Sequence, residues 1–511
     1  MKEYYPLIDL FAGAGGLGEG FSSFATAKNQ KPFKIALSIE KDPDACSTLL
    51  LRSFYKKFEN GTVPEEYWQY LRGNLTREEL FKFYPKESSK AAEEVKCIEL
   101  GKTPYRETKS QISKCISGIK KWVLVGGPPC QAYSMVGRSR MKNTNPDFEN
   151  DERHFLYLEY LKILADFTPP VFVMENVQGL LTAKHLGDRI VEKILNDLKN
   201  PHQTTNSPRN GFGYRLFSFC TSILSKDCEP EDFLVQAEKF GIPQARHRVL
   251  ILGIRNDIDI TPSVLKPTPA PMVKQVIGDL PRIRSALSKE VDSLKQWKSV
   301  LESIRKENWY IKSDVNGFKH TVNKIDEALG IIGSEDLSLG EEVLKYRKKP
   351  KVYEEWYRSE SADIIINHTS RTHMRSDLLR YLFTSSYAAV NKKSAYLCDF
   401  PKSLLPIHKN IQHGVNKDFF SDRFKVQLGD KPSTTITSHI AKDGHYFIHY
   451  DPTQCRSLTV REAARLQTFP DSYKFEGTRT SQYRQVGNAV PPLLSFQIAE
   501  IIYDILHRIR L

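Results

Sequence analysis

Residues 7–21, LIDLFAGAGGLGEGF, decide the fold of this 511-residue chain. The apolar run Tyr5–Leu10 predicts a short buried strand, which leads directly into a turn with glycines at positions 13, 15 and 18. Glycine permits a tight turn and lets backbone N–H groups approach a ligand closely. The pattern therefore predicts a strand, a glycine-rich turn and a helix, the usual beginning of a doubly wound α/β fold that binds a nucleoside.

An acidic residue follows at the spacing that such a fold requires. Glu40 comes directly after the next predicted strand, Lys34–Ile39, and lies 22 positions after Gly18. An acidic side chain at this place accepts hydrogen bonds from the hydroxyls of a ribose. The pattern does not identify the nucleoside, because NAD, FAD and S-adenosylmethionine all fit it. A tight turn without a ligand is the alternative interpretation.

Strand-like and helix-like segments alternate through the first half of the chain. Such alternation predicts an α/β fold, with a doubly wound, mostly parallel sheet that is covered by helices on both faces. The predicted strands are Tyr5–Leu10, Lys34–Ile39, Trp122–Val125, Val171–Met174 and Val249–Gly253, and the predicted helices include Arg153–Ala165 and Leu186–Leu198.

Two further segments bring reactive side chains to the carboxyl edge of this sheet. Residues 126–134, GGPPCQAYS, follow a strand, and their rigid glycines and prolines present Cys130 as an exposed nucleophile. The strand Val171–Met174 delivers Glu175 to the same edge. A lone cysteine is usually a core residue and a lone glutamate a surface residue. At the end of a buried strand, however, a carboxylate needs a partner or a task.

Together, these segments closely resemble the DNA (cytosine-5) methyltransferase family. Three further blocks match in the family's order: QARHR at 244–248, RSLTVREAARLQTFP at 456–470 and QVGNAVPP at 485–492. The resemblance covers roughly residues 4–255 and 427–511. Residues 258–425 resemble only the variable target-recognition region of that family.

The resemblance implies a two-lobed organisation. Prolines at 262, 267, 269 and 271 interrupt the alternating pattern and mark a boundary. We expect a Rossmann-like catalytic domain over residues 1–257 that binds S-adenosylmethionine. A smaller target-recognition lobe is expected over 258–480, and a segment over 481–511 is expected to return to the catalytic domain.

The resemblance also implies a covalent mechanism of methyl transfer to C5 of cytosine. The Cys130 thiolate adds to C6 of the base, which places electron density on C5. Glu175 hydrogen-bonds N3 and the exocyclic amine, while Arg248 and Arg246 anchor the base carbonyl and Glu175. The target cytosine must be flipped out of the duplex to reach these groups. The sequence does not identify the base that removes the C5 proton.

Cofactor and DNA contacts follow from the same resemblance. The residues expected to line the S-adenosylmethionine site are Phe11, Gly13, Gly15, Leu17, Glu40, Asn74, Asn488 and Val490. Asn74 departs from the family's usual aspartate, but its side-chain oxygen can still accept a hydrogen bond from the adenine amine. Segment 131–150 is expected to close over the flipped base, with a plain loop as the alternative. The residues expected to contact DNA are Gln131, Ser134, Arg138, Arg140 and Thr435, although a Thr-rich edge strand explains Thr435 equally well.

Composition restricts the partners and the location. The 74 basic and 61 acidic residues give a net charge of +13, which favours a polyanionic partner, and double-stranded DNA is the one expected. The eight cysteines show no zinc-ligand spacing, so no metal is expected, and Cys130 is predicted to be the only chemically active one. No apolar run approaches the roughly 18 residues of a membrane span, and there is no signal-peptide pattern. We expect a monomer in the prokaryotic cytoplasm, associated with the nucleoid, and compatible with a cognate restriction endonuclease that acts on the same site.

Three alternative functions remain open from the sequence. The first is a tRNA cytosine-5 methyltransferase on the same fold, and the second is a catalytically inactive DNA-binding paralogue. The third is a nicotinamide oxidoreductase with the same glycine turn, which leaves Cys130 and Glu175 unexplained. The recognition sequence is not predicted, because the base-reading residues must lie in the variable lobe.

Overall fold

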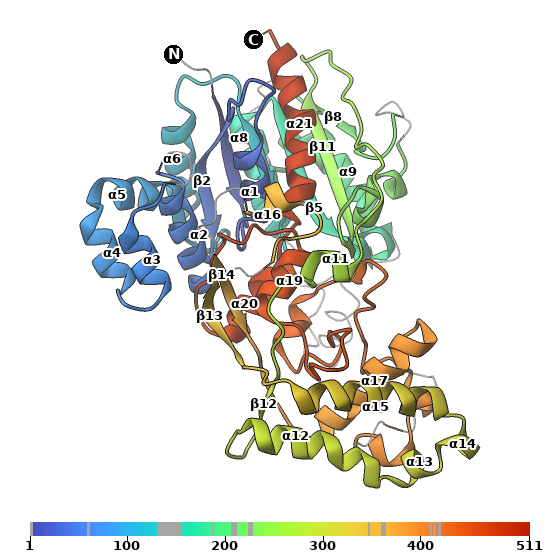
Figure 1. Ribbon diagram of the computed structural model, residues 1–511. Coiled ribbons are helices and arrows are strands. Elements are labelled where there is room, and N and C mark those ends of the chain that lie inside the picture. Colours follow the sequence, from blue (N-terminus) through green and yellow to red (C-terminus); the bar gives the residue numbers. More distant parts are fainter. Residues whose placement is uncertain are drawn as a thin grey trace. The chain divides into compact units, whose positions relative to one another are not determined.

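The structure is a computed structural model that describes residues 4–58, 62–129, 156–185, 188–205, 212–222, 228–345, 348–358, 364–407, 411, 415–416 and 421–510. The chain forms two compact units (Figure 1). The first comprises residues 1–59, 81–269 and 489–511, and the second comprises residues 60–80 and 270–488. These limits differ from the expected ones: 60–80 belong to the second unit, 258–269 belong to the first, and the C-terminal return begins at 489.

The first unit is built on an eight-stranded sheet, with strand order β3-β2-β1-β4-β5-β11-β8 and β9 paired to β11. Its strands β1 to β5 are parallel, whereas β11 runs antiparallel to β5, β8 and β9. The prediction of a mostly parallel sheet is confirmed, with a reversal at β11 that the sequence pattern does not reveal. The strands are β1 Tyr5–Leu10, β2 Phe33–Glu40, β3 Val95–Cys97, β4 Val123–Gly126, β5 Val171–Val177, β8 Tyr214–Phe217, β9 Leu234–Gln236 and β11 His247–Arg255.

Two helical layers bury the two faces of this sheet. Alternate strand residues point to opposite faces, so Val123 and Val125 belong to one apolar cluster and Leu124 belongs to the other. Helices α1 (Gly16–Ser23) and α21 (Pro492–Arg508) contribute to the first cluster. Helices α6 (Tyr105–Ile116), α8 (Leu156–Phe167) and α9 (Ile190–Lys199) contribute to the second.

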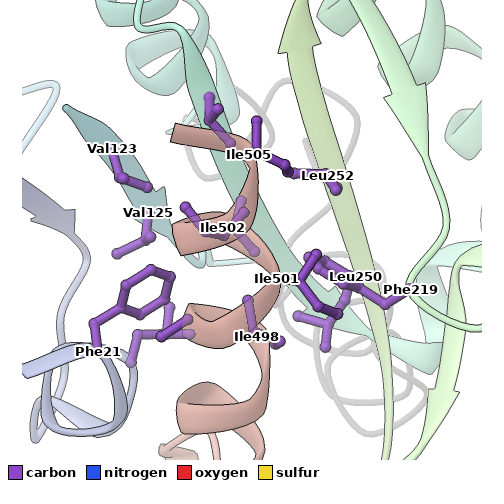
Figure 2. Packing of buried hydrophobic residues seen from close by; sticks show 14 of the residues in the cluster. Phe21, Val123, Val125, Phe219, Leu250, Leu252, Ile498, Ile501, Ile502 and Ile505 are labelled. Carbon is purple, nitrogen blue, oxygen red and sulfur yellow. The ribbon is translucent and has the colours of Figure 1, made fainter. Parts of the chain in front are cut away.

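Helix α21 brings the C-terminal part of the chain against the sheet. Figure 2 shows Ile498, Ile502 and Ile505 of this helix pointing into the cluster formed with β4 and β11. Each of these side chains is fully buried, and burial of a side chain of this size contributes about 2 kcal/mol. The helix approaches α1 closely because Gly20 has no side chain: a Cβ there would lie 2.4 Å from the Pro492 carbonyl oxygen.

Helix α2 (Pro43–Tyr55) follows β2 and has a well-defined start. The Asp42 carboxylate caps it, accepting hydrogen bonds from the backbone N–H groups of Asp44 and Ala45. The next helices are α3 Glu65–Leu71, α4 Arg77–Phe83 and α5 Pro85–Glu94.

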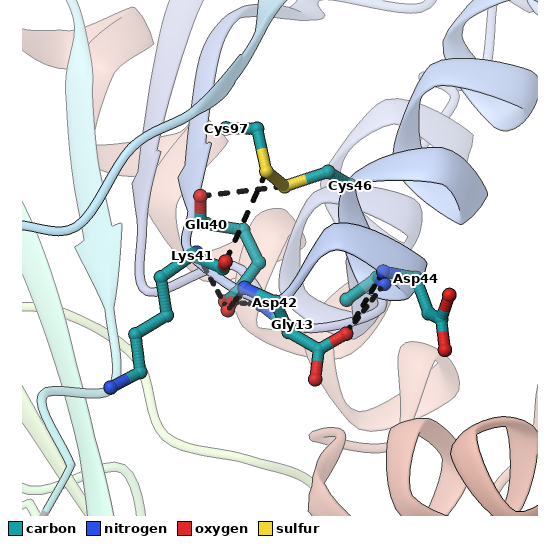
Figure 3. The surroundings of a disulfide bond; sticks show 8 residues. Gly13, Glu40, Lys41, Asp42, Asp44, Cys46 and Cys97 are labelled. Atoms are coloured by element: carbon teal, nitrogen blue, oxygen red, sulfur yellow. Dashed lines mark hydrogen bonds between the residues drawn. A yellow bond between two sulfur atoms is a disulfide. The ribbon is translucent and has the colours of Figure 1, made fainter. Parts of the chain in front are cut away.

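A disulfide joins Cys46, in the first turn of α2, to Cys97 of β3, with Cα atoms 5.7 Å apart (Figure 3). This bond contradicts the prediction that only Cys130 is chemically active. The pairing of β3 with β2 places Cys97 opposite Glu40, close to the start of α2. A sequence separation of 51 residues does not reveal that proximity.

The second unit contains a helical part and a smaller part with short strands. Helices α12 (Leu294–Glu302), α15 (Lys319–Ser334) and α17 (Arg375–Asn391) pack around an apolar cluster that includes Trp297, Leu329 and Phe383. The remaining elements include α11 Val273–Ile277, α13 Asn308–Ile311, α14 Ser313–Asn316, α16 Glu354–Arg358, β12 Ala286–Leu287, β13 Gly340–Lys345, β14 Ile364–Thr369, β15 Thr372–His373, α19 Val460–Leu466 and α20 Arg479–Asn488.

Buried charge lies at the centre of this second part. Arg456 forms two hydrogen bonds with the Glu462 carboxylate, at 2.6 and 2.7 Å. Arg465 binds both Asp279, at 2.6 Å, and Asp471, at 2.8 Å. Arg461 donates to three backbone carbonyl groups, and all three arginines are fully buried. The arginines of the 456–470 block thus stabilise the interior of the second unit through these contacts.

By length and composition, one stretch of the described chain, Arg479–Arg508, could cross a membrane. It comprises α20 and α21, and 67% of its apolar window is buried inside the structure. A core helix of a soluble protein passes the same test.

Candidate active site

The glycine turn has the geometry that its sequence predicts. After β1, the residues Phe11 (φ +56°), Gly13 (φ +56°) and Gly15 (φ +77°) all adopt left-handed backbone conformations. Such a conformation is costly for Phe11, and strain of this kind is concentrated at functional sites. Among the described residues no side chain caps α1. Its N-terminal backbone N–H groups therefore face the turn, where a helix start favours an anionic ligand group.

Glu40 joins the glycine turn to the start of α2 (Figure 3). One carboxylate oxygen accepts a hydrogen bond from the Gly13 N–H at 2.7 Å. The other accepts from the N–H groups of Lys41, at 2.8 Å, and Asp42, at 2.9 Å. The half-buried carboxylate is thus fixed in place beside the turn by three backbone N–H groups.

Asp9, two residues before Phe11, is a buried carboxyl group beneath this turn. Burial raises its pKa to about 8, and the negative charge of Glu40 adds to the rise, while the backbone N–H of Gly18 opposes it. Asp9 is therefore protonated at neutral pH, so its carboxyl group adds no negative charge beside Glu40.

The segment around Val490 lies directly against the turn. A Cβ at Gly16 would be 2.1 Å from the Val490 carbonyl oxygen, so only glycine fits there. The Leu17 side chain is buried in the apolar cluster of the first unit, and its carbonyl oxygen accepts a hydrogen bond from Ser495 Oγ at 2.7 Å. The predicted neighbours Gly13, Gly15, Glu40 and Val490 are thus brought together.

Three predicted site residues lie in the second unit. Asn74 is exposed just after α3, and its N–H donates to the Gln69 carbonyl at 2.9 Å. Asn488 is exposed at the last position of α20. Thr435 is half-buried between the short strand β16 (Ser433–Thr434) and a 3₁₀ turn, Ser438–Ala441.

A second group of polar side chains lies where β5 ends. Glu175 and Arg248 form an ion pair of 2.9 Å, and each side chain is only 14% exposed. In the antiparallel pairing of β5 with β11, Glu175 lies opposite Leu250 and Arg248 lies opposite Val177. Arg248 is two residues from Leu250, so its side chain lies on the same face as Glu175.

The two predicted arginines are both buried here. Burial lowers the pKa of Arg248, and the Glu175 carboxylate opposes that change. Burial also lowers the pKa of Arg246, which is 1% exposed, and the Arg248 charge lowers it further. Two guanidinium groups thus interact with one carboxylate, that of Glu175. The excess positive charge favours binding of a further electronegative oxygen at this place.

The loop that leads to Cys130 is fastened to the end of β5. A Cβ at Gly127 would lie 2.7 Å from Glu175 Oε2, so the second glycine of the GGPP sequence makes room for the carboxylate. The buried Asn176 donates from Nδ2 to the Pro128 carbonyl at 3.5 Å. The sequence pattern does not indicate these roles of Gly127 and Asn176.

Five predicted residues lie outside the described part of the chain: Cys130, Gln131, Ser134, Arg138 and Arg140. The structure places the loop only as far as Pro129, one residue before Cys130. Among the described residues, no group of three or more His, Cys, Asp or Glu side chains could hold a metal ion.

Comparison with known proteins gives a consistent result. Residues 87–504 match the family of C-5 cytosine-specific DNA methylases. The type II methyltransferase M.Bpa9945I of Bacillus paralicheniformis is 33% identical over 523 aligned positions, which cover 98% of this chain and 99% of the relative. The type II methyltransferase M.DdeI of Desulfomicrobium norvegicum is 25% identical, over 97% of this chain and 88% of the relative.

A solved structure shows the same fold. It is an E. coli prophage-encoded protein described as a DNA modification methyltransferase, and it superposes with a TM-score of 0.53 at 17% identity. The alignment covers 99% of this chain and all of the other.

The fold and the site thus define an α/β methyltransferase. This chain belongs to the C-5 cytosine-specific DNA methylase family, and its activity is that of a DNA (cytosine-5-)-methyltransferase. The resemblance stated from the sequence motifs is confirmed.

Proposed function

We propose that this enzyme transfers a methyl group from S-adenosylmethionine to C5 of a cytosine that is flipped out of duplex DNA at a specific sequence. The observation that carries the proposal is the Glu175–Arg248 pair, which lies beside Gly127 at the root of the Cys130 loop. This pair places an acidic and a basic group where the loop begins. Recognition of cytosine requires both, the acidic group for N3 and the exocyclic amine and the basic group for the carbonyl oxygen.

The residues around the glycine turn fit S-adenosylmethionine, which supplies an electrophilic methyl group on a sulfonium when bound. The fixed Glu40 carboxylate would accept from the ribose hydroxyls. The uncapped start of α1, after Gly15, would receive the carboxylate of the methionine part. Phe11, Gly13, Leu17 and Val490 would complete this side of the site, with Asn74 and Asn488 as its further proposed members.

The reacting base would be held by Glu175 and the two arginines. Glu175 would bind N3 and the exocyclic amine, with Arg248 fixing the orientation of the carboxylate at 2.9 Å. The base carbonyl would supply the further oxygen that Arg246 and Arg248 favour. Charge that develops on the ring during attack would be stabilised by these groups, which are already in place and shielded from water.

Cys130 would be the nucleophile of the reaction. Its thiolate would form a bond to C6, and the electron pair would move to C5, which takes the methyl group. Loss of the C5 proton and release of the Cys130 sulfur would then restore the aromatic base. Gln131, Ser134, Arg138, Arg140 and Thr435 would contact the DNA around the flipped base.

The names of the relatives support sequence-specific modification. Both M.Bpa9945I and M.DdeI are named type II methyltransferases. We propose a cognate restriction endonuclease with the same site, a monomeric enzyme, and a cytoplasmic location near the nucleoid.

The direct test is transfer of a labelled methyl group from S-adenosylmethionine to duplex DNA, with tRNA as the competing substrate. We expect label in DNA, none in tRNA, and none with Glu175→Gln or Cys130→Ala. Label in tRNA alone would favour the tRNA methyltransferase. Bisulfite sequencing of DNA from cells that express the chain would then give the recognition sequence.

A further inference from the structure

A buried carboxylate, Glu19, lies on the helix that begins at the glycine turn. Its side chain is 2% exposed, and its backbone N–H donates to the Gly15 carbonyl at 2.8 Å. Its neighbours Leu17 and Phe21 belong to the apolar core. A buried charge in such surroundings is unfavourable unless it is paired, so the partners of Glu19 are informative.

The cationic partners of Glu19 come from α2. Arg52 binds both carboxylate oxygens, with Nε at 3.0 Å and Nη2 at 2.6 Å, and it is 6% exposed. Lys56, the residue that directly follows α2, lies 2.9 Å from Oε2. Although burial raises the pKa of Glu19, the charges of Arg52 and Lys56 outweigh burial and hold that pKa well below its usual range. The carboxylate is therefore charged, and it is held by two side chains of another helix.

The two helices joined in this way both begin at the proposed cofactor site. Helix α1 starts at the glycine turn, and α2 starts just after Glu40. Their starts are already linked by the hydrogen bond from the Gly13 N–H to the Glu40 carboxylate, 2.7 Å long. The Glu19–Arg52 pair links the same helices a second time, further from the ligand. Two separate links fix the distance and the direction between the helices, whereas one link leaves them free to pivot.

One further contact joins the end of α2 to α1, from Lys56 Nζ to Ser22 Oγ at 2.5 Å, and it lies beside the same pair. Gly16 and Gly20 bring α1 against the C-terminal segment around Val490 and Pro492. The Cys46–Cys97 disulfide ties α2 to β3.

We infer that Arg52 is a positioning residue for the cofactor: through Glu19 it sets the Glu40 carboxylate relative to the glycine turn. This inference rests on the proposed cofactor site. It predicts that changes to the buried pair alter cofactor affinity, although none of its members is proposed to touch the cofactor.

A control ion pair lies in the same sheet, at the opposite ends of the strands from the proposed site. Arg255 forms a similar two-pronged pair with Asp257, at 2.7 and 2.9 Å, and is 12% exposed. It follows Ile254, which pairs with Val171 at the beginning of β5, so it lies away from the strand ends that carry Glu175. Arg255→Met removes a two-pronged ion pair whose acidic partner, Asp257, is 32% exposed, and it leaves the strand ends that carry Glu40 and Glu175 unchanged.

The experiment measures the Kd of S-adenosylmethionine by calorimetry for Arg52→Met, Arg52→Lys, Glu19→Gln and Arg255→Met, each checked for folding by its urea midpoint. We expect Arg52→Met and Glu19→Gln to raise the Kd about tenfold, since misplacement of a binding group by a fraction of an ångström has effects of this order. Arg52→Lys, which keeps the charge, should recover part of the affinity. Arg255→Met should bind with the wild-type Kd.

Kinetics separate positioning from general weakening of the protein. For Arg52→Met we expect KM for S-adenosylmethionine to rise with Kd, while kcat at saturating cofactor stays within about twofold of the wild type. If Arg52→Met does not fold, Glu19→Gln, which keeps the size of the side chain, replaces it. A wild-type Kd in the folded variants of both Arg52 and Glu19 would overturn the inference.

A further variant distinguishes this failure from failure of the proposed function. Glu40→Ala should abolish most cofactor binding if the site is correctly placed. Unchanged binding by Glu40→Ala would overturn the cofactor site itself. Weakened binding by Glu40→Ala together with normal binding by the Arg52 and Glu19 variants would overturn the positioning role alone.

Discussion

The sheet of the first unit is packed by aliphatic and aromatic side chains on both faces, whereas three fully buried arginines lie at the centre of the second unit. Both regions contain residues that match the family's sequence blocks. In the first unit the matching residues Glu40 and Glu175 lie at strand ends and remain partly accessible, whereas Arg246 of the same unit is 1% exposed. In the second unit Arg456, Arg461 and Arg465 bind carboxylates and backbone carbonyl groups in the interior. A block that matches the family can therefore contain partly accessible carboxylates in one region and buried arginines with internal hydrogen bonds in another.

The largest expected effect is on the buried charges of the second unit. Arg465→Met takes from Asp279 its cation at 2.6 Å and leaves Asp471 with only the more distant Arg461, at 3.7 Å. Removal of one partner from a buried pair costs about 3–5 kcal/mol. Urea denaturation should show this loss. The control is Arg305→Met, whose ion pair with Glu302 is nearly half exposed and should cost less than about 1 kcal/mol. Equal costs for the two variants would mean that burial of an ion pair does not decide its contribution to the stability of the second unit.

The next effect concerns Asp9 and the first unit. Because the pKa of Asp9 is raised from 3.8 to about 8, the unfolded chain releases this proton between those pH values while the folded chain keeps it. The stability that depends on this group is complete below pH 3.8 and is lost as the pH rises through 8. Between pH 5 and 7 the loss amounts to about 3 kcal/mol, at 1.36 kcal/mol per pH unit. In Asp9→Asn the free energy of unfolding should lack this component, so a pH dependence identical to the wild type would contradict the assignment.

The buried histidines of the second unit should respond to pH in the opposite direction. Burial lowers the pKa of His368 and of His449 from 6.5 to about 4. The unfolded chain then takes up protons below pH 6.5 that the folded chain does not, so stability falls as the pH falls from 6.5 towards 4. Each histidine contributes about 2 kcal/mol of loss between pH 6.5 and 5. His368→Gln should flatten the acid side of the stability curve, and an unchanged acid slope would show that His368 does not titrate in this way.

The smallest effect is expected from a conservative change in the apolar core of the first unit. Ile502→Val removes one methylene from a fully buried side chain of α21 and should cost about 1 kcal/mol. The chemical denaturation midpoint checks this value. A loss of unfolding free energy as large as that of Arg465→Met would contradict this ranking of the two variants.

The sequence predicts local features of the first unit well, since each is encoded in a short stretch. The turn at Gly13–Gly18 and the acid at Glu40 follow from glycine conformation and fixed spacing. The direction of β11 does not, because apolar periodicity is the same in parallel and antiparallel strands. The links from Glu19 to Arg52 and from Cys46 to Cys97 join residues far apart in the chain, and no local pattern encodes them.

The second unit is less predictable for a related reason. Charged residues are normally exposed, so the burial of Arg461 and Arg465 runs against composition-based expectation. Residues 60–80 belong to this unit because of their tertiary contacts. They come long before the proline-rich boundary in the sequence, so no local pattern assigns them to it. The expected site residues of the first unit stand in short motifs that match the family, whereas residues 258–425 contain no motif from which base-reading residues could be named.

The most direct test of the central claim is covalent capture of the target base by Cys130. A duplex that contains the recognition sequence with 5-fluorocytosine at the target position blocks loss of the C5 substituent, so the enzyme should remain attached to the DNA. We predict a denaturation-resistant complex with the wild-type protein only when S-adenosylmethionine is present, and none with Cys130→Ser. An equally abundant complex with Cys130→Ser, or none with a wild-type sample that methylates normal DNA, would contradict the mechanism.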